Sequence, residues 1–312
     1  MKRLLAAASF AVALAATPTF AADPESCKTV HLSDVGWTDI TSTTATASVI
    51  LKALGYEPNT SILSVPVTYA GLSKGDIDVF LGNWMPTMEG DLAPHRDDGS
   101  VIVLRPNLEG AKYTLAVSKS LADEGLKDFA DIAKFGDELD WKIYGIEAGN
   151  DGNRQILDMI SKDAFGLGKF ELVESSEQAM LAEAKRAQKS GHGIVVLGWE
   201  PHPMNQNLDM VYLTGGDDFF GPNFGGATVY TNVRKGLVEE CPNLGKLLTN
   251  LGFTLDMENA IMGSILDEGE DPETAATTWL EAHPDALGPW LEGVTTFDGK
   301  DGLAAVKSAL GV

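Results

Sequence analysis

Short apolar, β-rich runs alternate regularly with helical segments along the chain. Such alternation is typical of an α/β protein. We expect strands at residues 29–32, 61–65, 77–81, 101–104, 111–117, 142–146, 170–173, 194–197, 210–213 and 227–231. We expect helices at residues 41–54, 69–74, 128–135, 153–165 and 177–189, and a mainly helical region from residue 237 onward.

The length predicts two lobes, because a chain of this size is at the upper end for a single core. The segments near residues 111 and 227 are the expected crossings between the lobes. Lobe one then holds residues 23–110 plus 228–312, and lobe two holds residues 111–227. Each lobe is predicted to be a central β-sheet flanked by helices, with a ligand in the cleft between the two lobes.

The first residues indicate export rather than a folded element. Lys2 and Arg3 precede an apolar run over residues 4–16 that is too short to span a bilayer, and Ala21 and Ala22 offer small residues for cleavage. We interpret residues 1–22 as a secretory signal peptide and expect a periplasmic protein.

The chain contains two cysteines, Cys27 and Cys241. In an oxidising compartment a disulfide between them is the default expectation. Both fall in predicted lobe one, so the pair is compatible with the proposed division. The chain has no CxxC motif, so thiol chemistry is not expected.

The strong negative charge excludes some classes of partner. The formal net charge is −22, and it becomes −24 once Lys2 and Arg3 are removed. Nucleic acids and anionic membranes would be repelled, so we expect neither as a partner. A cationic ligand would be attracted, although many exported proteins are acidic for solubility alone.

Two similar stretches place a Trp near the end of an apolar run, with a Pro two residues later. They are DIDVFLGNWMP (76–86), which contains Trp84, and HGIVVLGWEPH (192–202), which contains Trp199. Trp37 in DVGWTD (34–39) and Tyr113 also lie at expected strand ends, where α/β sheets bind ligands. The alternative is that these aromatic residues pack in cores. Trp141, Trp279 and Trp290 lack this setting and are assigned to packing.

Several aromatic faces that converge on one site favour a quaternary ammonium ligand. Such a cation has no N–H to donate, so ring quadrupoles and dispersion must hold it. Asp39 would add a carboxylate, or alternatively cap the helix expected over residues 41–54. Asn150 and Asp151 in EAGNDGN (147–153) could meet a ligand hydroxyl or carboxylate, or form an ordinary turn and cap.

Together the export signal, DVGWTD, GNWMP, AKYTLAV, AGNDGN and GWEPH make the chain resemble the substrate-binding proteins of ABC transporters for choline and betaines. The resemblance covers essentially all of the chain after the signal and is strongest to the choline-binding type. It implies an aromatic box of Trp37, Trp84, Tyr113 and Trp199 that closes when the lobes come together. It also implies that Asp39 faces the cation and the hydroxyl end. Asn150 would help to hold the hydroxyl.

The resemblance further implies a monomer that delivers its ligand to a membrane permease, without a cofactor or a metal. Few basic side chains lie near the candidate loops; His202 and Arg154 are the candidate donors for a betaine carboxylate. Asp39 and Asp151 favour choline, with glycine betaine or proline betaine as the alternative and acetylcholine left open. A secreted choline-ester hydrolase is a distant alternative, because G-x-S-x-G and H-E-x-x-H motifs are absent, so we predict no enzyme activity.

Overall fold

The structure, a computed structural model, describes residues 22–312. The signal peptide expected over residues 1–22 therefore lies outside the described residues, apart from its last residue. Within residues 22–312, none of the helices combines the length and the apolar character that a membrane crossing needs.

The strands form one mixed sheet in the order β2-β1-β3-β9-β4-β7-β5-β6, with β8 paired to β4. Their bounds are β1 Thr29–Asp34, β2 Glu57–Ile62, β3 Val79–Met85, β4 Val101–Ser118, β5 Lys142–Tyr144, β6 Glu171–Val173, β7 Val195–Glu200, β8 Met210–Tyr212 and β9 Gly226–Arg234. The predicted α/β class is confirmed by this arrangement of a sheet flanked by helices.

Helices cover the sheet on both sides. The α-helices are α1 Thr38–Ala53, α2 Val65–Lys74, α3 Glu89–Asp97, α4 Lys119–Glu124, α5 Asp151–Ser161, α6 Glu177–Ser190, α7 Met204–Asn207, α8 Asp217–Phe220, α9 Pro222–Gly225, α10 Leu237–Glu240, α11 Pro242–Asn250, α12 Leu255–Gly263, α13 Pro272–Ala282, α14 Leu287–Trp290 and α15 Gly302–Leu310. Short 3₁₀ segments are η1 Glu25–Cys27, η2 Phe129–Phe135, η3 Ala164–Lys169 and η5 Pro284–Ala286, and η4 Ser264–Glu268 is a π-helix.

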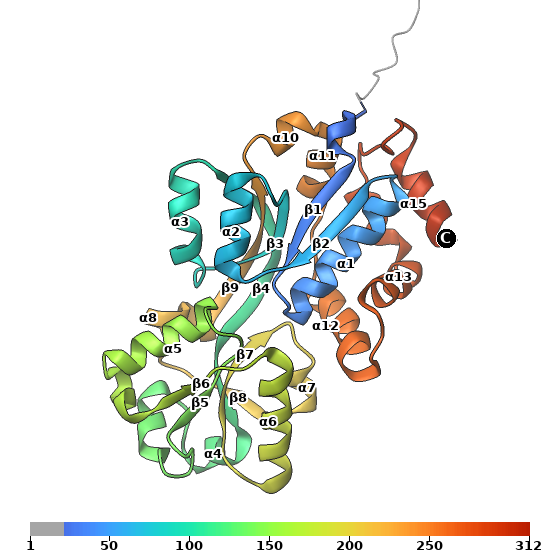
Figure 1. The fold of residues 1–312 in the computed structure, drawn as a ribbon. Helices are drawn as coiled ribbons and strands as arrows, with labels where there is room; N and C mark the ends of the chain where they lie inside the picture. Colours follow the sequence, from blue (N-terminus) through green and yellow to red (C-terminus); the bar gives the residue numbers. More distant parts are fainter. Residues whose placement is uncertain (1–21) are drawn as a thin grey trace, which may run out of the picture.

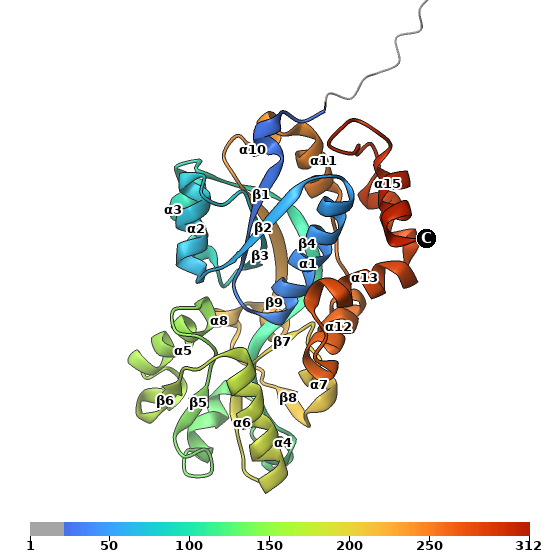
Figure 2. The same cartoon turned by 45° about the vertical axis from the view of Figure 1, so that its right-hand side comes forward.

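The molecule has two bodies, which Figures 1 and 2 show from two directions. One contains β1–β3, α1–α3 and the C-terminal helices; the other contains β5–β8 and α4–α7. Strand β4 runs between them: it pairs with β9 as far as Lys112, and from Lys112 onward it pairs with β7. The division at residues 111 and 227 stays a prediction about domain boundaries, and "lobe one" and "lobe two" are used below in that sense.

The predicted elements need several corrections. Residues 101–118 are one strand, not two, because the chain absorbs Pro106 and Gly110 as irregularities in the β4–β9 register. Residues 65–74 form a helix, which begins earlier than the predicted residue 69 and includes Val65 from the predicted strand 61–65. Pro66 suits the first turn of this helix. The predicted helix 128–135 is a 3₁₀ segment with Asp128 as its N-cap.

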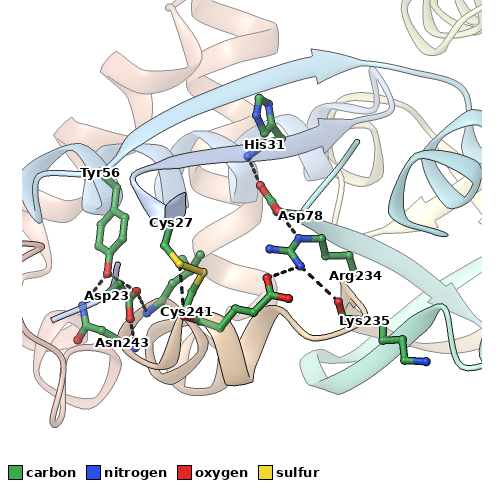
Figure 3. Close-up of a disulfide and its surroundings, with 11 residues drawn as sticks. Asp23, Cys27, His31, Tyr56, Asp78, Arg234, Lys235, Cys241 and Asn243 are labelled. Carbon is green, nitrogen blue, oxygen red and sulfur yellow. Dashed lines mark hydrogen bonds and ion pairs between the residues drawn. A yellow bond between two sulfur atoms is a disulfide. The ribbon is translucent and has the colours of Figure 1, made fainter. Parts of the chain in front are cut away.

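The disulfide between Cys27 and Cys241 is present, with its Cα atoms 5.8 Å apart (Figure 3). It ties η1, which directly precedes the first strand, to the segment between α10 and α11. Nearby, Asp78 accepts from the backbone N–H of His31 at 2.8 Å and from Nε of Arg234 at 2.7 Å. The disulfide and these bonds hold the first strand to the chain that returns after residue 228.

Candidate functional site

A small cavity lies where the two lobes meet, with about 230 Å³ of space between atoms, part of which is open to solvent. It is lined by Trp37, Asp39, Trp84, Tyr113, Ile146 and Trp199. Trp37, Asp39 and Trp84 come from predicted lobe one. Tyr113, Ile146 and Trp199 come from predicted lobe two. The structure thus brings together five of the residues that the sequence singled out, and adds Ile146.

Secondary structure fixes each aromatic wall. Trp37 directly precedes α1, while Trp84 and Trp199 are the penultimate residues of β3 and β7 rather than turn residues. Each of these two strands is followed by a cis X–Pro bond, at Met85–Pro86 and Glu200–Pro201. Tyr113 in β4 pairs directly with Trp199 in β7, so the strand register sets two of the walls side by side.

The rings are inclined to one another instead of stacked face to face. The Trp84 and Tyr113 centroids are 5.9 Å apart at 54°, and those of Tyr113 and Trp199 are 6.4 Å apart at 77°. Phe220, which the sequence did not single out, packs at 90° against Tyr113 with centroids 6.0 Å apart. Inclined aromatic walls present ring faces to a shared space, as a box for a cation requires.

Asp39 is a buried carboxylate in the wall of this cavity. Its Oδ2 accepts from Nε1 of Trp84 at 3.1 Å, whereas its Oδ1 has no hydrogen-bond partner within residues 22–312. Burial raises the pKa of Asp39 well above its usual range, and the neighbouring Glu177 raises it further. The alternative helix-cap interpretation is wrong, because α1 begins at Thr38 and Asp39 lies inside its first turn.

Tyr113 packs against the start of α5. Its hydroxyl donates to Oδ1 of Asn150 at 3.4 Å, and burial raises the pKa of Tyr113 well above its usual range. A Cβ added at Gly152 would lie 2.2 Å from the Tyr113 hydroxyl oxygen, so only glycine leaves room for this approach. Gly152, the second glycine of EAGNDGN, therefore helps to position the cavity wall that Tyr113 forms.

Asn150 and Asp151 are close to the cavity but do not line it. Asn150 is the N-cap of α5: its Oδ1 accepts from the backbone N–H of Asn153 at 2.8 Å, and its Nδ2 donates to the carbonyl of Glu147 at 2.6 Å. The turn-and-cap interpretation thus describes Asn150 in this structure, and its contact with a ligand stays a prediction.

Asp151 is fully buried, and neither of its carboxylate oxygens has a hydrogen-bond partner within residues 22–312. Burial raises the pKa of Asp151 to about 6. A direct role for Asp151 in binding also stays a prediction.

Glu147 is a site residue that the sequence did not reveal. Its Oε1 accepts from Nε1 of Trp37 at 2.8 Å, which joins the first aromatic wall to the opposite lobe. Burial raises the pKa of Glu147 to about 7. The residue begins EAGNDGN, but no local pattern marks it as the partner of a Trp more than a hundred residues earlier.

The two basic side chains considered as carboxylate donors have other partners. Nε2 of His202 donates to Oε1 of Glu177 at 3.0 Å, because its Nδ1 accepts from the backbone N–H of Met204. Arg154 pairs with Asp91. Among residues 22–312, no group of three or more His, Cys, Asp or Glu side chains is arranged to hold a metal ion.

The fold and the site define a class: a two-lobe binding protein that encloses a small ligand between its lobes. The family described as "Substrate binding domain of ABC-type glycine betaine transport system" matches residues 28–282. The chain belongs to this family.

The solved structures that resemble the chain include two choline-binding proteins and one glycine betaine-binding protein. One, an ABC-transporter choline binding protein in complex with choline, is 66% identical over 92% of this chain and 100% of its own, with a TM-score of 0.91. Another, an ABC-transporter choline binding protein in an unliganded semi-closed conformation, has the same identity and coverage and a TM-score of 0.85. Lactococcal OpuAC, closed on glycine betaine, is 27% identical over 84% of this chain and 99% of its own, with a TM-score of 0.76.

Proposed function

We propose that this protein binds choline in the aromatic cavity and delivers it to the membrane permease of an ABC transporter. Its family is that of the substrate-binding domains of such transport systems. The similarity to a choline-binding protein with bound choline, at 66% identity over 92% of the chain, supports the choice of ligand.

The observation that carries the proposal is the lining of the cavity. Trp37, Trp84, Tyr113 and Trp199 offer electron-rich faces, and Asp39 adds one carboxylate. A trimethylammonium group has no N–H, so it depends on such faces, each of which contributes up to ~2 kcal/mol when desolvated. In this interpretation the buried carboxylate faces the cation that it needs as a counter-charge.

The polar atoms of the wall favour choline over glycine betaine. The lining contains no Lys, Arg or His to balance a betaine carboxylate, and His202 and Arg154 are occupied elsewhere. Nε1 of Trp199 has no hydrogen-bond partner in the described chain and could donate to either tail. The free Oδ1 of Asp39 is an acceptor, so it would attract a hydroxyl and repel a carboxylate.

The cellular setting follows from the same proposal. We infer export by the signal peptide, a periplasmic location and a monomer whose lobes, divided near residues 111 and 227, close on the ligand. Asn150 accepts from the Tyr113 hydroxyl and caps α5, so we infer that it supports this wall, and that Asn150 and Asp151 help to hold the choline hydroxyl.

A binding role without catalysis fits the family description. The alternative of a choline-ester hydrolase predicts acid release from acetylcholine. Incubation of the protein with acetylcholine at constant pH would detect that acid, and we expect none.

Titration calorimetry with choline, acetylcholine, glycine betaine and proline betaine tests the ligand. We expect choline to bind at around micromolar, or about −8 kcal/mol, and glycine betaine to bind distinctly more weakly. Tighter binding of glycine betaine would overturn the choice of choline and the role given to Asp39. Absence of binding by all four compounds would overturn the proposed function.

A further inference from the structure

Within residues 22–312, four polar side-chain contacts join the predicted lobes, and they differ greatly in burial. Arg154 pairs with Asp91, and Asn207 donates to Asp267, on partly or fully exposed surfaces. The exposed Asn207–Asp267 contact contributes little, whereas the Arg154–Asp91 pair, with side chains 40% and 10% exposed, is partly buried. The hydrogen bond from Trp37 to Glu147 is partly buried. The contacts of Glu177 are different, because its side chain is 0% exposed.

Glu177 is the first residue of α6 in lobe two, and its carboxylate reaches α1 in lobe one. Oε2 accepts from the backbone N–H of Thr38 at 2.8 Å, and Oε1 accepts from Oγ1 of Thr38 at 2.7 Å. Oε1 also accepts from Nε2 of His202 at 3.0 Å, within lobe two. A buried carboxylate thus has three donors, two of which belong to the opposite lobe.

These contacts supply what the start of α1 otherwise lacks. The N-cap residue of α1 is Trp37, which offers no side-chain oxygen, and no cap from the helix's own segment is present in the described structure. The first N–H groups of a helix need acceptors, and the helix dipole favours an anion there. Glu177 therefore acts as the N-terminal cap of a helix in the other lobe.

The capped residue connects directly to the cavity. Thr38 lies between Trp37 and Asp39, both of which line the cavity, whereas Glu177 itself does not. Resting on the proposed function, we propose that Glu177 is a positioning residue that holds the lobes closed by capping α1. In this way it sets how long choline stays bound.

The physical effect is a shift between open and closed states. If the lobes part, Thr38 and Glu177 separate and both become hydrated. The hydrogen bonds between them therefore stabilise only the closed form. A contact present in one state alone shifts the equilibrium toward that state. Because the ligand leaves through the open form, loss of the contact should speed dissociation and leave association nearly unchanged.

The test uses Thr38→Val, which removes one donor to Glu177 while keeping the shape and the Glu177 charge. The matched control is Thr41→Val in the same helix, because Oγ1 of Thr41 donates to Oδ2 of Asp34 at 2.8 Å within lobe one. Radiolabelled choline is bound to each protein, and its release is followed after addition of excess unlabelled choline.

We expect release from Thr38→Val to be roughly tenfold faster than from wild type, as for a hydrogen bond to a charged group. Thr41→Val should lower the melting temperature but release choline at the wild-type rate. Glu177→Ala should release choline faster still, and adding Thr38→Val to it should change little further, because the two substitutions remove the same bonds.

Solution scattering of choline-saturated Glu177→Ala should give a larger radius of gyration than wild type. Equal release rates for wild type, Thr38→Val and Thr41→Val would overturn the positioning role. A wild-type protein that binds no choline would instead refute the proposed function, so the two failures are distinguishable.

Discussion

Nε1 of Trp84 donates to Oδ2 of Asp39 at 3.1 Å, and both side chains belong to the wall of one cavity. The bond fixes the carboxylate from one side and leaves Oδ1 without a partner in the described chain. Burying a carboxylate costs free energy unless charge or hydrogen bonds compensate it. A bound cation would supply that compensation, so we expect the charge of Asp39 to discriminate sharply between ligands.

Asp39→Asn keeps an acceptor for Trp84 and removes the charge. We expect it to weaken choline binding by roughly 1–3 kcal/mol, judged from hydrogen bonds to charged groups. The difference in affinity between choline and glycine betaine should also become smaller, because the carboxylate of betaine would no longer meet an anion. Calorimetry with both ligands checks this; wild-type affinity and an unchanged preference would show that Asp39 does not face the ligand.

The pH dependence of choline binding should report the same carboxyl. Burial raises the pKa of free Asp39, and a bound cation favours the ionised form and so lowers that pKa. Affinity should therefore be constant above the free-state pKa and fall as pH drops through it. Calorimetry at stepped pH values checks this. A fall of the same size in Asp39→Asn would assign it to another group.

The aromatic walls should carry most of the affinity. Trp84→Ala and Trp199→Ala should each weaken choline binding by tenfold or more, since a desolvated cation–π contact contributes up to ~2 kcal/mol. Trp290→Ala is the control: this Trp is buried and donates to the carbonyl of Gly252, away from the cavity. It should cost stability, by about 3–5 kcal/mol, and leave affinity nearly unchanged. Equal affinity losses in all three would mean that packing, not ligand contact, was measured.

Gly152 offers a test that removes no ligand contact. Its missing side chain makes room for the Tyr113 hydroxyl, so Gly152→Ala must move that ring or α5. We expect at least a tenfold loss of choline affinity, because a displaced wall of the box loses its cation–π contact. Gly90→Ala in α3 is the control, since an added Cβ there meets nothing within 4 Å. Unchanged affinity in Gly152→Ala would show that the Tyr113 position is not critical.

Local patterns were enough to predict the alternation of strands and helices along the chain and the set of aromatic residues in the cavity wall. Trp37, Trp84, Tyr113 and Trp199 stood out because each lies at an expected strand end, and the structure gathers them around one cavity. The helix starts were less predictable. Residue 38 begins α1 without a capping side chain of its own, because the cap comes from Glu177 in the other lobe.

Contacts across the lobes explain most of what the sequence concealed. Glu147 and Glu177 are acidic residues at the start of a loop and of a helix, positions where exposed carboxylates are ordinary. Their partners, Trp37 and Thr38, are distant in sequence, and no local pattern encodes that pairing. Ile146 is the last residue of the strand expected over residues 142–146, and the structure places it in the cavity wall.

Glu147 should make stability depend on pH. Burial raises its pKa to about 7, above the model-peptide value of 4.5. A carboxyl with a raised pKa stabilises the folded state while it is protonated. That contribution is complete below the unfolded pKa, and it is lost as pH rises from about 4.5 through about 7.

Glu147→Gln keeps an acceptor for Trp37 and cannot ionise. Between pH 5 and pH 8 the free energy of unfolding of wild type should therefore fall more than that of Glu147→Gln. The difference should be on the order of 1–2 kcal/mol, because partial exposure reduces the effect of burial. Asp151, whose pKa is raised to about 6, is present in both proteins, so the difference between them reports Glu147 together with its repulsion by Asp151.

Urea unfolding of both proteins at the two pH values gives the comparison. Glu57→Gln, whose side chain is 66% exposed, serves as the control and should follow wild type. Parallel losses of stability in wild type and Glu147→Gln would mean that Glu147 ionises freely. In that case burial would not keep Glu147 protonated near neutral pH.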